Sequence, residues 1–279
     1  MKTPFSRDLR ALLSDLARTY AARAGVESYS SRGTPGITLF PRSADGVRHG
    51  NFAPESFAAI LDAPDWRARL DKPHAQRARS LPEPHNRSAR ELDSCTSSDA
   101  LLMNVFCYPG AVRGSIGRLL GVADDTRPAF GVAGEVPLRG GRVDRTEIDM
   151  QLGDTLVEAK LTESSFTSMS VKNVERYTDL YEVFDRDALP RTDHASGDDA
   201  RYLSYQLIRN VLAIAHRPRA RFRVLIDDRR PDLMAEWTTL HSAIRNPAVR
   251  ARCTVVRWQQ LAAASPVPLR AFLALKYGL

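Results

Sequence analysis

The chain has 279 residues, of which 43% are hydrophobic and 26% charged, with a formal net charge of +7. These proportions are typical of a soluble globular protein, and no apolar run approaches the roughly 20 residues that span a bilayer. Charged residues interrupt the N-terminal segment, so it lacks the apolar block of a secretion signal, and we expect a cytoplasmic protein without membrane association. The excess positive charge favours a polyanionic partner such as nucleic acid.

Several common site types are excluded by the pattern of reactive residues. Cys95, Cys107 and Cys253 are widely spaced and form no C-x-x-C pair, so we expect reduced, mostly buried thiols. The histidines lack the spacing of a zinc site. The chain has neither a G-x-S-x-G elbow nor a P-loop.

The N-terminal part reads as helical and irregular. Leucines at helical spacing predict a helix over 8–23, and Gly, Ser and Pro make 25–55 irregular except for a short strand at 37–40. A helix begins near Pro54 and should end at Pro64. An apolar stripe within 94–109 predicts a capped helix, with Ser97 or Ser98 as the N-cap and capping-box spacing between residues 96 and 99.

Residues 65–90 are strongly basic and include Arg67, Arg69 and Lys72. One interpretation is a surface that contacts nucleic-acid phosphates. The other is a solvated connection, interrupted by prolines. The sequence leaves both open.

The remainder alternates strands and helices. We predict strands at 129–139, 146–152, 155–161, 220–227 and 253–258, and helices at 170–185, 199–216, 231–245 and 267–277. This order predicts an α/β fold with a mixed central β-sheet flanked by helices. We expect a helical and irregular N-terminal extension over residues 1–90 and a catalytic domain over 91–279.

Charged side chains converge on the hairpin that Gly153-Asp154 joins. Because side chains alternate along a strand, Glu158 and Lys160 share one face, and Asp149 on the neighbouring strand can join them. Burying such charges costs several kcal/mol per ion in rough terms, so the cluster points to function rather than stability. The alternative is an exposed cross-strand ion pair, the interpretation we prefer for Glu147, Asp154 and Glu163.

The hairpin's donors suit phosphodiester hydrolysis. Mg²⁺ takes oxygen ligands, which Asp149, Glu158 and the backbone carbonyl of Ala159 would supply. Lys160 would orient an attacking water or stabilise developing negative charge.

Asp149, eight intervening residues and Glu158-Ala159-Lys160 resemble the PD-(D/E)XK motif of the restriction endonuclease-like nuclease superfamily, although Ile148 replaces the motif's proline. The stretch 95–215 is similar to a bacterial branch of that superfamily. The resemblance implies a restriction endonuclease-like fold, Mg²⁺ (or Mn²⁺) bound by Asp149 and Glu158, and a catalytic Lys160. It also implies a further acid, for which we favour Glu135 over Asp99, and a glutamine on a later helix, matched by Gln206.

A second basic stretch contains Arg217, Arg219, Arg221 and Arg223. These arginines would track a phosphate backbone, or else form a solvated strand edge that resists sheet-to-sheet pairing.

We therefore expect a metal-dependent nuclease that hydrolyses phosphodiester bonds in DNA. A homodimer would supply the two cuts that cleavage of a duplex needs. One alternative is a non-catalytic nucleic-acid-binding protein that retains the nuclease fold. Another is a partner-binding protein whose positive charge is incidental.

Overall fold

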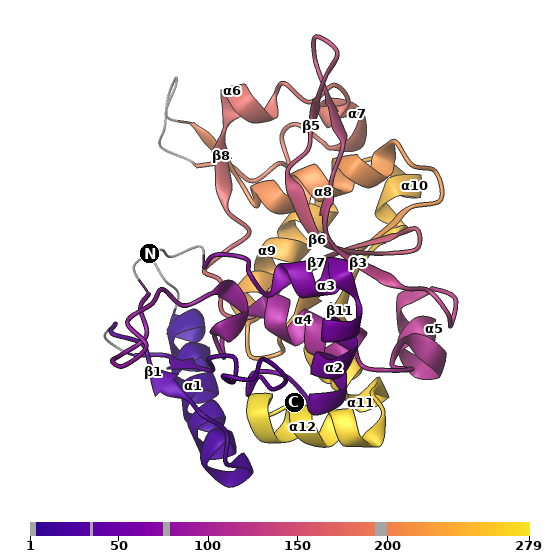
Figure 1. The fold of residues 1–279 in the computed structure, drawn as a ribbon. Helices are drawn as coiled ribbons and strands as arrows, with labels where there is room; N and C mark the ends of the chain where they lie inside the picture. The colour runs from indigo at the N-terminus through magenta and orange to yellow at the C-terminus, as the bar shows by residue number, and fades with distance from the viewer. Residues whose placement is uncertain (1–3, 34–35, 75–78, 193–199) are drawn as a thin grey trace. The chain divides into compact units, whose positions relative to one another are not determined.

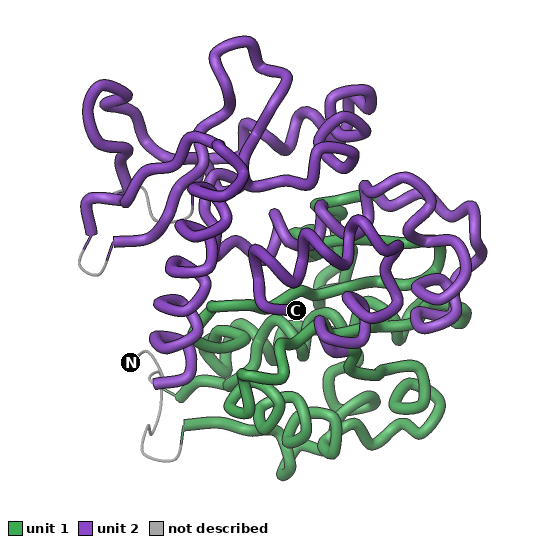
Figure 2. Tube along the Cα trace, turned by 90° about the horizontal axis from the view of Figure 1, so that it is seen from below, with its two compact units in different colours: residues 1, 129–256 green, residues 2–128, 257–279 purple. Residues whose placement is uncertain are grey.

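The computed structural model describes residues 4–33, 36–74, 79–192 and 200–279. The chain forms two compact units, shown in different colours in Figure 2. Unit 1 comprises residues 129–256, and unit 2 comprises residues 2–128 and 257–279. These boundaries concern compactness, and the expected division into domains 1–90 and 91–279 stays a prediction.

Unit 1 is built around a five-stranded sheet with the order β11-β10-β7-β6-β3 (Figure 1). Strand β7 is antiparallel to β6 and parallel to β10, so the sheet is mixed. Its strands are β3 (Pro128–Ala133), β6 (Glu147–Leu152), β7 (Thr155–Ala159), β10 (Arg221–Ile226) and β11 (Cys253–Arg257). The predicted mixed sheet flanked by helices is confirmed.

The β6–β7 hairpin has the predicted turn. Leu152 pairs with Thr155 across Gly153-Asp154, and Gly153 has a φ of 58°. Only glycine adopts this left-handed conformation without a Cβ penalty, so the turn fixes the register of the two strands. The register in turn decides which side chains of β6 face those of β7.

Helix α8 (Tyr205–Ala215) packs against β7 and β10 and closes the core of unit 1. Leu156 and Phe222 from the sheet are buried in the same cluster as Leu207 and Val211 of the helix. All five residues of β7 are buried, as expected for a strand with both faces covered. The shorter elements of the unit are α6 (Val171–Val174), α7 (Leu180–Val183), α9 (Pro231–Ser242), α10 (Pro247–Arg250), β4 (Val136–Leu138), β5 (Arg142–Asp144), β8 (Ser168–Ser170) and β9 (Arg201–Leu203).

Three predicted elements of unit 1 are wrong in extent. The predicted helix 170–185 is interrupted, because the backbone of 176–178 bonds to the β4 edge through Arg139 N–H to Arg176 O and Thr178 N–H to Pro137 O. The predicted helix 199–216 begins only at Tyr205, after β9 and the left-handed Ser204. The predicted strand 129–139 is broken at Glu135, whose φ is 54°.

Unit 2 is mainly helical. Its elements are α1 (Pro4–Ala24), β1 (Tyr29–Ser30), β2 (Thr38–Leu39), α2 (Pro54–Asp62), α3 (Pro64–Arg69), η1 (Glu91–Asp93), α4 (Ser98–Phe106), η2 (Val112–Ile116), α5 (Gly117–Leu120), α11 (Trp258–Ala264) and α12 (Val267–Tyr277). Pro64 ends α2 as predicted and also starts α3. The Ser97 side chain caps α4, as predicted, by accepting the Ala100 N–H.

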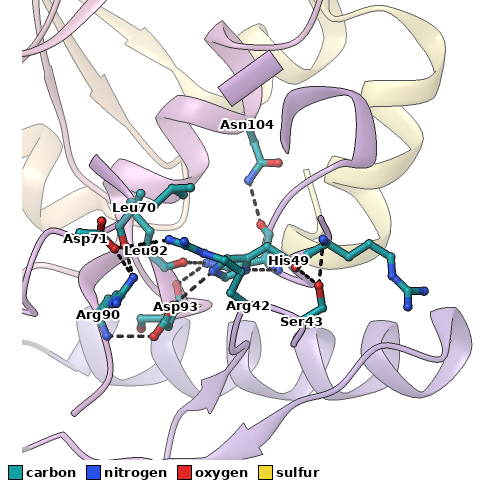
Figure 3. Close-up of polar contacts among 12 residues, drawn as sticks. Arg42, Ser43, His49, Leu70, Asp71, Arg90, Leu92, Asp93 and Asn104 are labelled. Atoms are coloured by element: carbon teal, nitrogen blue, oxygen red, sulfur yellow. Dashed lines mark hydrogen bonds and ion pairs between the residues drawn. The ribbon is translucent and has the colours of Figure 1, made fainter. Parts of the chain in front are cut away.

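A buried polar network holds the loops of unit 2 (Figure 3). His49 Nδ1 accepts the Asn51 N–H at 3.3 Å, so Nε2 carries the ring proton and donates to Asp93 Oδ1 at 3.2 Å. Burial lowers the pKa of His49, which therefore stays neutral. Asn104 donates to the Asn51 carbonyl at 2.9 Å and accepts the Ala53 N–H at 2.7 Å. These side chains bond to one another and to the backbone of the surrounding loops, so we interpret the network as structural.

Cys95, Cys107 and Cys253 are all free and buried, which confirms the prediction of reduced thiols. Within the described ranges, no helix combines the length and apolarity needed to cross a membrane.

Candidate active site

Asp149 lies where β6 and β7 separate. The last backbone pair of the hairpin toward this end joins Met150 to Val157, and one step further Asp149 would face Glu158. At this position the Asp149 side chain takes the place of a backbone acceptor for β7, because Asp149 Oδ2 accepts the Ala159 N–H at 2.8 Å. The hairpin thus opens at the two carboxylates, while β7 remains paired to β10 through Val224 and Leu225.

Glu158 is fully buried, with a relative exposure of 0%, and three donors converge on its carboxylate. Lys160 Nζ and Gln206 Nε2 donate to Oε1 at 2.7 and 2.8 Å, respectively. Asn210 Nδ2 donates to Oε2 at 2.7 Å. The strand supplies the cation and α8 supplies both amides, since residues 206 and 210 lie four apart on one helical face. An ionised carboxylate is therefore accommodated at zero exposure.

Lys160 is a buried ammonium, with 5% of its surface exposed. Burial works against its charge, but the carboxylates of Glu158, Asp149 and Glu163 outweigh burial and raise its pKa above the usual value. Its Nζ also lies 5.6 Å from the centroid of the Phe166 ring. Lys160 is consequently protonated at neutral pH, and its Nζ donates to Glu158.

Arg209 orients the amide of Asn210. Its Nε and NH2 groups donate to Asn210 Oδ1 at 3.1 and 3.0 Å, which directs the Asn210 NH₂ group toward Glu158. The same guanidinium donates to the Glu147 carbonyl at 2.8 Å. Arg209 therefore ties the beginning of β6 to the helix that holds Glu158.

The donors at the opened hairpin fit a hard divalent cation. Among the residues that the structure describes, no group of three or more His, Cys, Asp or Glu side chains could hold a metal ion. Mg²⁺ needs fewer, because it often uses one or two carboxylates and fills its other positions with water and phosphate oxygens. Asp149 and Glu158 stay the predicted pair of carboxylate ligands, and the Ala159 carbonyl stays the predicted third oxygen.

Comparison with known families decides the classification. Residues 19–278 match the family described as restriction endonuclease associating with ARP (REase-ARP). The chain belongs to this family. The predicted restriction endonuclease-like relationship is thereby confirmed.

Membership of REase-ARP indicates a nuclease-like hydrolase with nucleic acid as its substrate. Restriction endonuclease-like nucleases typically use divalent metal ions, in keeping with the oxygen donors at the β6–β7 opening. No curated protein and no solved structure matches the chain.

The two candidates for a further acid both contact basic side chains. Glu135 sits between β3 and β4 with 60% of its side chain exposed, and its Oε2 lies 3.4 Å from Arg217 NH2. Asp99 belongs to unit 2, where its Oδ2 accepts Arg69 at 2.9 Å and Lys72 at 2.7 Å. Asp99 therefore holds basic residues instead of completing the predicted capping box. A role for Glu135 in catalysis or metal binding stays a prediction.

The predicted phosphate-binding residues differ in how their side chains are engaged. Arg67, Arg219 and Arg221 are exposed. Arg69 and Lys72 pair with Asp99, and Arg217 donates to the Gly134 carbonyl at 3.2 Å and approaches Glu135. Arg223 donates to the carbonyls of Phe222 and Arg252, both at 3.1 Å. Nucleic-acid binding by this set stays a prediction.

Sequence reasoning placed Gln206 at the site but did not assign Asn210 or Arg209. The available signal was the i, i+4 spacing of Gln206 and Asn210, which puts two amides over the same carboxylate. Glu163 was expected either at the surface or as a group that supports the site from behind the ligands. It is half-buried, accepts the Leu161 N–H at 2.6 Å and contributes to the raised pKa of Lys160.

Proposed function

We propose that this chain is a metal-dependent nuclease that hydrolyses phosphodiester bonds in DNA, using Mg²⁺ or Mn²⁺ held by Asp149 and Glu158. One observation carries the proposal: a carboxylate at 0% exposure accepts hydrogen bonds from Lys160 and from two helix amides, beside a second acid. Charges buried in this manner are costly and concentrate at functional sites.

The chain's own residues divide the chemical work. Asp149 and Glu158 would hold the ion, and the Ala159 carbonyl would add a third oxygen. When bound, the ion supplies Lewis-acid polarisation of the phosphate and a lower pKa for the attacking water. Lys160, fixed by Glu158 and with a raised pKa, would stabilise negative charge that develops on the phosphate. Gln206 and Asn210 keep the Glu158 carboxylate oriented.

Binding of DNA would use the positive charge of the protein, including Arg67, Arg219 and Arg221, which are exposed. Because one chain presents one such site, we propose that duplex cleavage involves a homodimer. The family description names association with ARP, and we propose that a partner of that kind acts together with the chain.

The test is cleavage of plasmid and linear duplex DNA in Mg²⁺ or Mn²⁺, with EDTA as the reversal. Asp149→Asn should lose at least about 100-fold of the rate, since removing one key electrostatic group costs about that much in catalysis. Asp154→Asn makes the same chemical change at the exposed hairpin turn and should cleave like the parent. Equal rates for Asp149→Asn and the parent would reject the site.

A non-catalytic nucleic-acid-binding protein is the second candidate. It is favoured by the fact that both oxygens of Glu158 already accept hydrogen bonds. Such a protein would bind DNA with a steep salt dependence and show no cleavage with any divalent ion.

A further inference from the structure

The β4–β5 hairpin of unit 1 ends in a narrow glycine tip. Val136 pairs with Asp144 and Leu138 with Arg142, so residues 139–141 form the turn. Gly140 and Gly141 have φ values of 80° and 73°, and a Cβ added at either would meet nothing within 4 Å. The glycines are therefore required by the backbone conformation and not by crowding. In the view of Figure 1 this tip extends past α6 and α7.

Three arginines occupy the hairpin and its exit. Arg139 stands in the turn, Arg142 begins β5, and Arg145 follows β5, and all three are exposed. No ion pair joins any of them to an acid within the part of the chain that the structure describes. Arg139 also donates its N–H to the carbonyl of a fourth basic residue, Arg176, at 2.7 Å.

The acids around the hairpin are engaged with other groups. Asp144 accepts hydrogen bonds from the hydroxyls of Tyr177 and Tyr205 and from the Thr146 N–H. Two further acids have partners of their own, as seen in the pairs Glu175–Tyr181 and Asp179–His216. Three arginines against one adjacent carboxylate, Asp144, leave the hairpin with an excess of positive charge, which favours a polyanionic ligand.

The hairpin is also joined to the candidate active site. Asp144, anchored by the two tyrosines, is followed after two residues by β6, which carries Asp149. The Glu147 carbonyl at the start of β6 is held by Arg209. Asp149 lies seven positions after Arg142. The two are therefore at most about 25 Å apart, which is the rise of about seven base pairs.

We propose that the β4–β5 hairpin is a nucleic-acid grip, in which Arg139, Arg142 and Arg145 contact the phosphates of a duplex on one side of the cleavage site. A two-stranded ribbon with a side-chain-free tip fits the major groove, and flanking arginines then reach the backbone. The proposed grip depends on the proposed nuclease function in one respect only: the distance from the hairpin to the cleavage site assumes that Asp149 marks that site. The proposed grip uses none of the basic residues predicted at 67–72 and 217–223.

The test is fluorescence anisotropy of a 30-base-pair duplex in EDTA, so that binding is measured without cleavage. The triple variant Arg139→Ala/Arg142→Ala/Arg145→Ala should bind at least about tenfold more weakly at 50 mM salt. Losing three phosphate contacts should lower the slope of log affinity against log salt by about 2.7. The triple lysine variant keeps the charge and should bind within about threefold of the parent.

The matched control removes three exposed arginines from helix ends elsewhere, as Arg23→Ala/Arg250→Ala/Arg270→Ala. If the hairpin triple variant and the control triple variant bind the duplex with the same affinity, the grip is refuted. Loss of binding to an acidic protein by the hairpin triple variant would not rescue it. If the triple alanine variant does not fold, the single variants Arg142→Ala and Arg142→Lys are compared instead. Arg142→Ala should then lower the slope of log affinity against log salt by about 1, relative to Arg142→Lys. If the parent never cleaves DNA but the hairpin triple still loses binding, the nuclease is refuted and the grip stands.

Discussion

Gln206 Nε2 donates to Glu158 Oε1 at 2.8 Å, to the same oxygen that accepts Lys160 Nζ at 2.7 Å. A helix amide and a strand cation thus share one buried carboxylate oxygen. This arrangement makes α8 part of the site and predicts how substitutions on either side will act.

Gln206→Glu should reduce cleavage at neutral pH by at least about tenfold. Once ionised, the new carboxylate would place a negative charge at hydrogen-bond distance from Glu158 and would replace the amide donor by an acceptor. Cleavage rates measured across pH should show this loss growing as pH rises. Gln151→Glu makes the same change on β6, where the amide donates to the Gly153 carbonyl, and should leave the rate unchanged. Equal effects of the two substitutions would argue against the role of Gln206.

Lys160→Met should destabilise the fold by about 3–5 kcal/mol, because it leaves Glu158 buried and charged without a cation. The double variant Lys160→Met/Glu158→Gln removes both charges and should recover much of that stability. Urea unfolding of the two single variants and the double variant measures the coupling. Additive effects of the two substitutions would contradict a buried ion pair.

Much of this site could be predicted from sequence because its geometry is local. The Gly153-Asp154 turn and strand alternation place Glu158 and Lys160 on one face, two residues apart. Gln206 was reachable from the motif resemblance, and Asn210 from its i, i+4 spacing to Gln206. The contact of Arg209 with the Glu147 carbonyl depends on how α8 packs over the sheet, which no local pattern reports.

The elements that sequence misjudged are those where tertiary contacts override periodicity. Apolar spacing over 170–185 predicts one helix, yet the 176–178 backbone bonds to β4 instead. Left-handed Glu135 and Ser204 break a predicted strand and a predicted helix, and neither residue type signals such a conformation. The pairing of Asp99 with Arg69 and Lys72 is likewise a contact between segments distant in sequence.

Lys276→Met should stabilise the protein at neutral pH. Burial lowers the pKa of Lys276 to about 7, despite the opposing effect of Cys95, and its Nζ lies 3.9 Å from the Tyr277 ring centroid. In the unfolded chain the pKa of Lys276 is about 10.4. Between pH 7 and this value the unfolded chain binds more protons than the folded protein, so the stability of the parent should rise with pH over this range. Lys276 contributes at most about 1.4 kcal/mol per pH unit to the slope of the unfolding free energy against pH. Urea unfolding from pH 6 to 10 should show the gain of the variant shrinking as pH rises; a constant difference would refute the buried charge.

Glu236→Gln should also stabilise the protein at pH 7. Burial raises the pKa of Glu236, although its Oε2 accepts the Phe166 N–H at 3.3 Å and the Ser204 hydroxyl at 3.1 Å. The folded state therefore binds the proton more tightly, and stability falls as pH rises above the unfolded pKa of about 4.3, with the full cost present at neutral pH.

The amide that Glu236→Gln introduces could keep both acceptor contacts through its oxygen, whereas Glu236→Ala loses both and should cost about 1 kcal/mol for each. Thermal unfolding at pH 4 and pH 7 measures the comparison. A glutamine variant that is less stable than the parent at pH 7 would contradict this account of the carboxylate.

The most direct measurement is calorimetric titration of Mn²⁺ into the parent, Asp149→Asn and Asp154→Asn. If Asp149 and Glu158 form one divalent-cation site at the opening of the β6–β7 hairpin, the parent and Asp154→Asn should bind one ion with equal affinity. Asp149→Asn should bind at least about tenfold more weakly, in the range seen when groups at a metal site are removed. Binding of Mn²⁺ that is the same in Asp149→Asn as in the parent would contradict the central claim.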